Sequence, residues 1–206
     1  MYKKAGAYPP PDLKLQEKIP LPTIQNAAME FLRGREDVVV FGAHAVNAYV
    51  KEKRATQELD LLSTRTAKLA TELRDHLNRR LRIFLLIRRL NKGEGRRIYQ
   101  ASREGNHALI DIRPVPQLPP AKRLAQVLFM EPAELTASKV IAFQNRRDKP
   151  KGDMDWRDLA TLLLTFPELK SDDGAVMERL HAARVEEAVL AVWKELVAQT
   201  SSLPPK

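Results

Sequence analysis

The sequence predicts an α/β (α+β) chain, in which a small mixed sheet with helices, over residues 21–115, precedes a helical subdomain over residues 121–200. Two observations predict this division. In the first part, short runs of β-branched and apolar residues alternate with segments whose apolar residues recur at helical spacing. After a cluster of prolines between residues 114 and 120, almost no strand signal remains and helical spacing prevails.

The first residues are expected to lie outside this fold. Residues 2–6 resemble the translation of a cloning site, and the prolines that follow favour extended chain, so residues 1–20 are interpreted as a cloning scar and leader. Thr23 is expected to cap a first helix, whose apolar residues recur at helical spacing until Gly34.

Short elements follow up to the proline cluster. A β-branched run over residues 38–41 predicts a buried strand that stops at Gly42. Residues 83–91 are ambiguous, because their apolar run suits either a strand or a helix. The other expected elements are helices over 43–53 and 66–81 and strands over 58–62, 98–101 and 108–112.

Helices are expected throughout the second half. Pro132 suits the first turn of a helix that runs to Asn145, and two further helices are expected over residues 155–164 and 185–196. Trp193 and the valines of the last helix either belong to the core or form an interface, in which case the chain is a structural subunit.

The composition is that of a globular chain. It has 206 residues, of which 44% are hydrophobic, enough for a sizeable core. The longest apolar runs stop far short of the roughly 18 residues that a membrane crossing needs. The absence of cysteine excludes disulfide bonds, thiolate nucleophiles and Cys-ligated metals. We therefore expect a cytoplasmic protein that has no membrane partner.

The charge is unevenly distributed. The net charge is +9, and residues 74–104 hold ten Lys or Arg residues against three Asp or Glu residues. A basic surface of this kind favours phosphate-rich partners such as nucleotides or RNA. The alternative is a solvated face without a partner.

Three carboxylates are candidates for a cation site. Alternation along the second expected strand puts Glu58 and Asp60 on the same face, about 7 Å apart. Asp111, in a later apolar strand, supplies a third carboxylate if the two strands are neighbours. Three carboxylates are suited to hold two magnesium ions for displacement at phosphorus. The alternatives are exposed polar positions for Glu58 and Asp60, and an ion pair with a nearby arginine for Asp111.

The first strand leads directly into a helix at Gly42 and Ala43. A strand that ends in glycine and is followed by a helix presents backbone N–H groups to a phosphate. The order of strand, Gly42, helix, acidic strand and later acidic strand resembles the nucleotidyltransferase superfamily. More narrowly, residues 38–165 resemble the minimal nucleotidyltransferases of the AbiEii/AbiGii toxin type. The matching stretches are Phe41-Gly42-Ala43-His44-Ala45-Val46, Arg54-Ala55-Thr56-Gln57-Glu58-Leu59-Asp60-Leu61, Glu134-Leu135-x-Ala137-x-Lys139 and Asp155-Trp156-Arg157-Asp158-Leu159.

The resemblance implies a role for each matching residue. Glu58, Asp60 and Asp111 would hold the metal ions, and Asp111 would also accept the proton of the attacking hydroxyl. Lys139 would face the phosphates or the base of the nucleotide. The residues assigned to nucleotide binding or to its support are Gly42, Ala43, His44, Arg54, Thr56, Asp155 and Asp158.

Three of these assignments have structural alternatives. Thr56 would otherwise only pair its strand, Lys139 would be a solvated lysine, and Asp153 or Asp155 would cap a helix.

The implied activity is transfer of a nucleoside monophosphate from a nucleoside triphosphate to a hydroxyl group, with two Mg²⁺ ions. The basic stretch 74–104 favours RNA as the acceptor, such as a tRNA end, over a cationic aminoglycoside, and a protein hydroxyl is a further option. A toxin-like role with an antitoxin protein as partner is also implied. Two residues depart from the family pattern: Glu58 replaces Asp, and Ala43 replaces Gly or Ser. The alternative is therefore an inactive relative that binds nucleotide or RNA.

Overall fold

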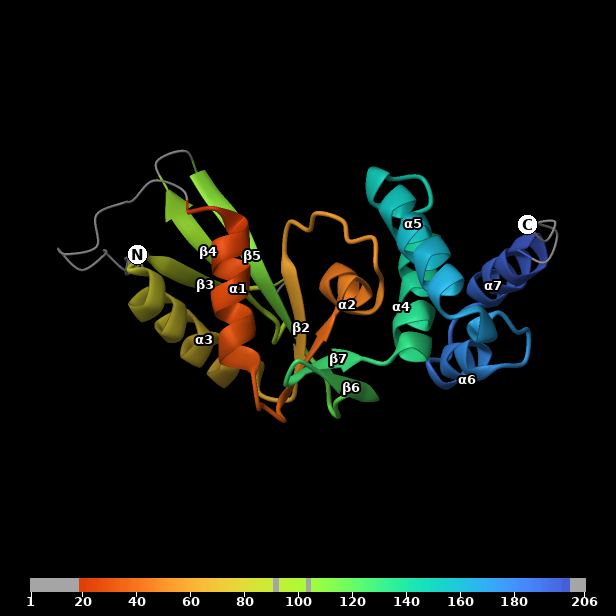
Figure 1. Cartoon of the computed structure of the whole chain (residues 1–206), viewed down its shortest axis with the longest axis horizontal. Helices are drawn as coiled ribbons and strands as arrows, with labels where there is room; N and C mark the ends of the chain where they lie inside the picture. Colours follow the sequence, from red (N-terminus) through yellow and green to blue (C-terminus); the bar gives the residue numbers. More distant parts are fainter. Residues whose placement is uncertain (1–18, 91–92, 103–104, 201–206) are drawn as a thin grey trace, which may run out of the picture. The chain divides into compact units, whose positions relative to one another are not determined.

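The computed structural model describes residues 19–90, 93–102 and 105–200. The expected scar and leader therefore lie, up to residue 18, outside the described residues. Within the described residues, seven strands form one mixed sheet in the order β3-β4-β5-β2-β1-β7-β6, and helices follow the last strand (Figure 1). The predicted fold class is confirmed.

The strands lie mostly where the sequence predicts them. The ambiguous segment 83–91 contains a strand. The seven strands are β1 Val38–Phe41, β2 Leu59–Ser63, β3 Leu85–Arg89, β4 Arg96–Ser102, β5 Gly105–Pro114, β6 Ala121–Leu124 and β7 Val127–Met130.

The helices also follow the predicted spacing, with differences at their ends. The second helix stops at Tyr49 rather than near residue 53, and the helix expected from residue 155 already begins at Pro150. The helices are α1 Leu21–Leu32, α2 Gly42–Tyr49, α3 Thr66–Leu81, α4 Pro132–Asn145, α5 Pro150–Thr165, η1 Pro167–Leu169, α6 Ala175–Ala182 and α7 Glu187–Thr200. No helix of the described residues combines the length and apolar character that crossing a membrane requires.

The expectation that strands are nearly absent after the proline cluster is wrong, because β6 and β7 lie there. These two strands are joined only by Ala125 and Gln126, both with positive φ, 45° and 68°. Two-residue connections of this kind normally carry Asn or Gly, so the usual turn signal is missing from the sequence. The backbone carbonyl of Gln126 accepts a hydrogen bond from the N–H of Gly34 at 2.9 Å, which helps to hold the turn.

The chain divides into two compact units. Among the described residues, the first unit, called the sheet unit, comprises those within 19–39, 56–118 and 125–128. The second, called the helical unit, comprises residues 40–55, 119–124 and 129–200. Residues 40–55 thus group with the helices that follow the proline cluster.

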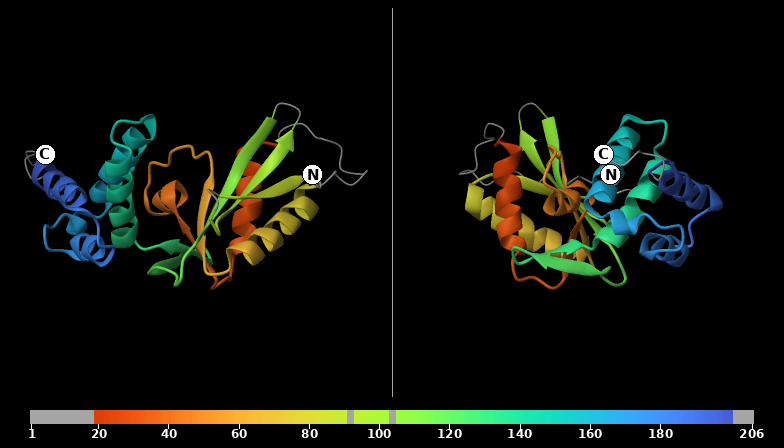
Figure 2. Two further views of the ribbon diagram at one scale, coloured as in Figure 1. Left: turned by 180° about the vertical axis from the view of Figure 1, so that it is seen from behind. Right: turned by 45° about the vertical axis from the view of Figure 1, so that its right-hand side comes forward.

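In the sheet unit, α1 and α3 lie on one face of the β3–β4–β5 part of the sheet (Figures 1 and 2). Leu59 and Leu61 of β2 stand opposite Ile110 and Ile112 of the parallel β5, and all four are fully or almost fully buried. The apolar residues of α3 recur at helical spacing, which buries its inner stripe against the sheet. Because side chains alternate along a strand, Asp60 and Asp111 project from the opposite face.

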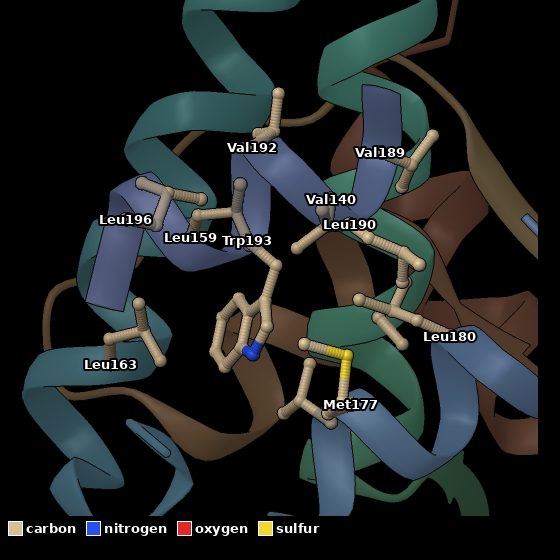
Figure 3. Close-up of a cluster of buried hydrophobic side chains, with 12 residues drawn as sticks. Val140, Leu159, Leu163, Met177, Leu180, Val189, Leu190, Val192, Trp193 and Leu196 are labelled. Atoms are coloured by element: carbon tan, nitrogen blue, oxygen red, sulfur yellow. The ribbon is translucent and has the colours of Figure 1, made fainter. Parts of the chain in front are cut away.

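In the helical unit, the helices pack around Trp193 of α7, as Figure 3 shows. The side chain of Trp193 is fully buried, and its indole N–H donates a hydrogen bond to the backbone carbonyl of Ser171 at 3.2 Å. Val140, Leu159 and Met177 come from three other helices of the same cluster. Trp193 and the valines Val189 and Val192 are therefore core residues, and the interface interpretation is wrong for them.

Truncating this tryptophan tests the helical core. Trp193→Ala is expected to lower the free energy of unfolding by about 3–5 kcal/mol, because it leaves a large cavity among packed side chains. Urea unfolding followed by circular dichroism measures the loss. Leu164→Ala is the control, since Leu164 is 75% exposed, and it is expected to change stability by less than about 0.5 kcal/mol. Equal losses in the two variants would contradict this account of the core.

Candidate active site

The sheet unit brings together two of the three candidate carboxylates. Strands β2 and β5 pair in parallel, and their register puts Asp60 directly opposite Asp111. Glu58 lies one residue before β2, which begins at Leu59, and its carboxylate lies within 4 Å of Arg97, the same arginine that binds Asp111. The condition on which Asp111 is included, that its strand lies beside the strand of Asp60, is met.

An arginine completes this row of charges. Arg97 of β4 lies opposite Asp111 on the other side of β5, in the antiparallel part of the sheet. Its Nε and Nη2 donate hydrogen bonds to Oδ1 and Oδ2 of Asp111, at 2.6 and 2.7 Å. The Nη2 atom of Arg97 also lies 3.7 Å from Oε1 of Glu58. The alternative interpretation of Asp111, an ion pair with a nearby arginine, is confirmed.

The burial of this row is unequal. Asp111 is only 3% exposed, whereas 37% of the Arg97 side chain is exposed. The hydrogen bonds to Asp111 raise the pKa of Arg97 above its already high ordinary value, so the guanidinium stays charged. A second arginine, Arg113, approaches Asp60 to 3.7 Å. Each of the three carboxylates therefore has a guanidinium within 4 Å.

The carboxylates match magnesium in kind, since Mg²⁺ prefers hard oxygen ligands. Their arrangement does not fit the ion, because both oxygens of Asp111 already accept hydrogen bonds from Arg97. In the part of the chain that the structure describes, no three His, Asp or Glu side chains form a group able to hold a metal ion. In this conformation, Arg97 is the cation at Asp111.

The helical unit contains a second cluster of charges. The ammonium of Lys139 lies 3.0 Å from Oδ1 of Asp155 and 2.6 Å from Oδ2 of Asp158. Arg54 donates two hydrogen bonds to Asp158, at 2.7 and 2.8 Å. Arg146 contacts the other oxygen of Asp155 at 2.7 Å. The structure thus brings together four residues that the sequence assigns to the site, and adds Arg146.

Burial decides between two interpretations of this cluster. Lys139 is 7% exposed, so the interpretation as a solvated lysine is wrong. Asp155 lies within α5, which begins at Pro150, so it is not the helix cap. Both carboxylates hold basic side chains in place, and contact of these basic groups with a nucleotide stays a prediction.

Asp158 has the most strongly paired carboxylate of this cluster. Burial alone would raise its pKa, but the hydrogen bond from Arg54 and the charge of Lys139 outweigh burial and lower the pKa below the ordinary value of 3.8. The same contact raises the pKa of Arg54. Asp158 therefore stays ionised in the folded state and adds stability in that form.

The expected phosphate loop has the predicted local form. Gly42 has a φ of 67°, in the left-handed region that favours glycine, and α2 begins at this residue. Ala43 and His44 lie in the first turn of α2, where backbone N–H groups have no partner within the helix. No side chain caps this end of α2.

Thr56 lies before β2 in the sheet unit. Gln25 donates a hydrogen bond to its hydroxyl and one to its carbonyl, both at 3.4 Å.

The structure contains a basic pocket, whereas the sequence predicts only a basic stretch over residues 74–104. It has a volume of about 510 Å³ and lies in the sheet unit, between the start of α3 and the β3–β4 connection. Its charged lining residues are Arg65, Lys68, Arg89, Arg96 and Glu94. Arg89 and Arg96 belong to the basic stretch 74–104, whose members Lys92 and Arg103 lie outside the described residues.

Several lining residues of the pocket have partners, and Arg96 donates hydrogen bonds to the backbone carbonyls of Glu94 and Gly95. Arg65 also pairs with Asp37, whose pKa burial would raise, but the hydrogen bonds from Arg35 and Arg65 lower it to about 2.

Known structures share this fold. No protein-family model matches the chain, and no curated protein sequence matches it significantly. The Megavirus polyadenylate synthase superposes with a TM-score of 0.58 at 13% identity, over 71% of this chain and 32% of that chain. JHP933 from Helicobacter pylori superposes with a TM-score of 0.52 at 12% identity, over 87% of this chain and 90% of that chain.

A nucleotidyltransferase-like protein from Paracoccidioides brasiliensis has a TM-score of 0.42 at 13% identity, over 84% of this chain and 89% of that chain. The likeness to the first two structures concerns the fold alone. This chain has the nucleotidyltransferase fold, and it spans about a third of the length of the polyadenylate synthase.

The lowered pKa of Asp158 predicts how stability depends on pH. As the pH falls, the unfolded chain takes up the Asp158 proton before the folded chain does, so the contribution is complete above about pH 5 and is lost below pH 4. Asp158→Asn is expected to lower the free energy of unfolding by about 3 kcal/mol at pH 7, and by less at pH 3. Urea unfolding at both pH values measures the two losses.

Asp172→Asn serves as the control for this experiment, because Asp172 is exposed. It is expected to change stability little at either pH. A loss for Asp158→Asn that is the same at pH 7 and pH 3 would show that its charge is not what stabilises the helical unit.

Proposed function

We propose that this chain is a nucleotidyltransferase that transfers a nucleoside monophosphate from a nucleoside triphosphate to a hydroxyl group of RNA. The observation that carries the proposal is the register of β2 and β5, which sets Asp60 beside Asp111, with Glu58 within 4 Å of the arginine that binds Asp111. Carboxylates grouped on one face of a sheet suit both the binding of a cation and the uptake of a proton. The nucleotidyltransferase fold supports the same reaction class.

The proposed reaction is a displacement at the α-phosphorus. A bond forms between the acceptor oxygen and the α-phosphorus, and the bond from that phosphorus to the oxygen bridging to the β-phosphate breaks. Pyrophosphate leaves with the electron pair, and the hydroxyl proton passes to a carboxylate, for which the resemblance implies Asp111. We also propose Mg²⁺ as the cation of Glu58, Asp60 and Asp111, which requires an arrangement other than the one described, because Arg97 takes both oxygens of Asp111.

The triphosphate is assigned to groups of the helical unit. The first turn of α2, with Gly42, Ala43 and His44, offers backbone N–H groups to a phosphate. Lys139 and Arg54 offer positive charge, and their position is held by Asp155 and Asp158. These contacts, and that of Thr56, are part of the proposal.

RNA is the proposed acceptor because of the basic pocket. Three of its four cations, Lys68, Arg89 and Arg96, carry charge that suits phosphate groups of an RNA backbone. The AbiEii resemblance adds a tRNA end as acceptor, a toxin-like role and an antitoxin protein as partner, and it leaves a protein hydroxyl as another acceptor. A cytoplasmic location is proposed with it.

A second function is favoured by one specific observation, the paired hydrogen bonds of Arg97 to Asp111. If this pair is permanent, Asp111 is not free for a metal ion. The chain would then be an inactive relative that binds nucleotide or RNA, in line with Glu58 and Ala43 at positions where the family has other residues.

Labelled transfer separates the two functions. The protein is incubated with Mg²⁺, an RNA pool and each α-phosphate-labelled nucleoside triphosphate in turn. Label on RNA is expected with the unchanged chain and is expected to fall at least about 100-fold in Glu58→Ala/Asp60→Ala. Glu186→Ala/Glu187→Ala, which removes two exposed carboxylates of the helical unit, is expected to leave the label unchanged. Binding of nucleotide without any label would favour the inactive relative.

The basic pocket predicts how RNA binding depends on salt. Arg89→Gln/Arg96→Gln is expected to weaken binding to RNAs of any sequence by roughly ten-fold. The slope of log affinity against log salt concentration is expected to fall by the equivalent of about one to two phosphate contacts. Fluorescence anisotropy at salt concentrations from about 50 to about 200 mM measures the affinity and its dependence on salt. Arg157→Gln/Lys194→Gln, which removes two exposed cations of the helical unit, is the matched control. If the control weakens binding as much, the pocket is not the RNA site.

A further inference from the structure

Two arginines stand opposite each other where β3 ends and β4 begins. The antiparallel register of these strands pairs Arg89 directly with Arg96. Like charges at directly opposed positions of two strands repel each other and lower stability. Neither arginine forms an ion pair with another residue that the structure describes, and the hydrogen bonds of Arg96 go to neutral backbone carbonyls. The fold therefore keeps an unfavourable pair of charges at this point.

The basic pocket adds a third uncompensated cation to this pair. Lys68, in the first turn of α3, is exposed, lines the same pocket and has no ion pair among the described residues. Arg65 also lines the pocket, but Asp37 offsets its charge. Among the described lining residues, Glu94 alone is acidic. Three uncompensated cations against one carboxylate leave an excess of two positive charges around the pocket.

The start of α3 adds backbone donors to the pocket. The first N–H groups of this 16-residue helix have no partner within the helix, and no side chain caps them. The aligned peptide dipoles also give this end a partial positive charge. The hydroxyl of Thr66 donates a hydrogen bond at 2.9 Å to the backbone carbonyl of Glu94, in the β3–β4 connection. This bond joins the two sides of the pocket before any ligand binds.

The charge of the pocket favours one kind of phosphate. An internal phosphodiester of RNA has a single negative charge, whereas a phosphate monoester carries about −1.5 to −2 at pH 7 and has three acceptor oxygens. The monoester matches the excess of two positive charges more closely. The volume of about 510 Å³ is within the range of small-molecule sites, so it has room for a phosphate and the attached sugar.

We propose that this pocket binds the 5′-terminal phosphate of an RNA chain and distinguishes it from a 5′-hydroxyl end. Lys68, Arg89 and Arg96 balance the charge of the monoester, and the first N–H groups of α3 donate hydrogen bonds to its oxygens. The bound phosphate also offsets the repulsion between the two opposed arginines. The inference rests on the proposed function only in naming RNA as the source, since a free nucleotide carries the same group.

Two RNAs that differ only at the 5′ end test this inference. One short RNA with a 3′ fluorophore is prepared with a 5′-phosphate or a 5′-hydroxyl and titrated in EDTA, without nucleoside triphosphate. Fluorescence anisotropy is expected to show at least about ten-fold tighter binding of the phosphorylated form to the unchanged chain. In Arg89→Gln/Arg96→Gln this preference is expected to fall below about three-fold, and Lys68→Gln is expected to reduce it as well.

The matched control is Arg79→Gln/Arg80→Gln. It removes two exposed arginines from the last turn of α3, in the same unit and the same basic stretch as the pocket. It is expected to weaken both RNAs equally and to keep the full preference for the 5′-phosphate, because it lies at the other end of the helix.

Thermal unfolding without RNA provides a second measurement. Arg89→Gln is expected to melt no lower than the unchanged chain, because it removes a like charge opposite Arg96. A lower melting temperature would show that Arg89 supports the fold and would contradict its role in an anion site.

Competition identifies the source of the phosphate. Adenosine 5′-monophosphate is expected to displace the phosphorylated RNA only well above the dissociation constant of that RNA, and adenosine is expected not to displace it. Displacement by the monophosphate at concentrations near that constant would overturn the assignment to RNA.

Three further results would overturn the inference. They are equal affinities of the unchanged chain for the two RNAs, a full preference in Arg89→Gln/Arg96→Gln, and an equal loss of preference in the control. The proposed function fails separately. A preference for the 5′-phosphate without any label transfer would refute nucleotidyl transfer and leave the phosphate site, whereas label transfer without the preference would do the reverse.

Discussion

Compensation of buried carboxylates is the constraint on which both units depend. A carboxylate removed from water is tolerated only beside a cation or several hydrogen-bond donors. Asp111 meets this requirement through Arg97 in the sheet unit, and Asp155 and Asp158 meet it through Lys139 and arginines in the helical unit. Apolar packing alone would not retain these charges, since leucine or valine would fill the same positions at lower cost.

The two charge clusters differ in how deeply their cations are buried. In the helical unit, Lys139 is itself buried between two carboxylates, so neither partner has an easy exit. In the sheet unit, the carboxylate is buried and its arginine is partly exposed. The first arrangement keeps both members of each ion pair away from water, and the second leaves the guanidinium partly in contact with water.

The sequence predicts helices and strands well where the spacing of apolar residues and the residues that begin or end an element agree. The helix over residues 66–81 and the helix from Pro132 to Asn145 have the predicted bounds. The hairpin of β6 and β7 has no turn signal in the sequence, because Ala125 and Gln126 take positive φ without being the residues that usually do so.

At the candidate site, alternation along each strand could place Asp60 and Asp111 on one face. It could not reveal Arg97 as their companion, because the pairing of β4 with β5 depends on the whole sheet. The partners of Lys139 could not be predicted from the sequence either, since Asp155 and Asp158 come from another helix.

The position of the two tryptophans has a practical consequence for spectroscopy. The chain contains only Trp156 and Trp193, and both belong to the helical unit. Trp193 is fully buried, whereas Trp156 is 40% exposed, so the two differ in access for a quencher such as acrylamide. Intrinsic tryptophan emission therefore reports on the helical unit. The sheet unit, which holds Asp60 and Asp111, contains no tryptophan. Events at Asp111 need a probe placed on the sheet itself.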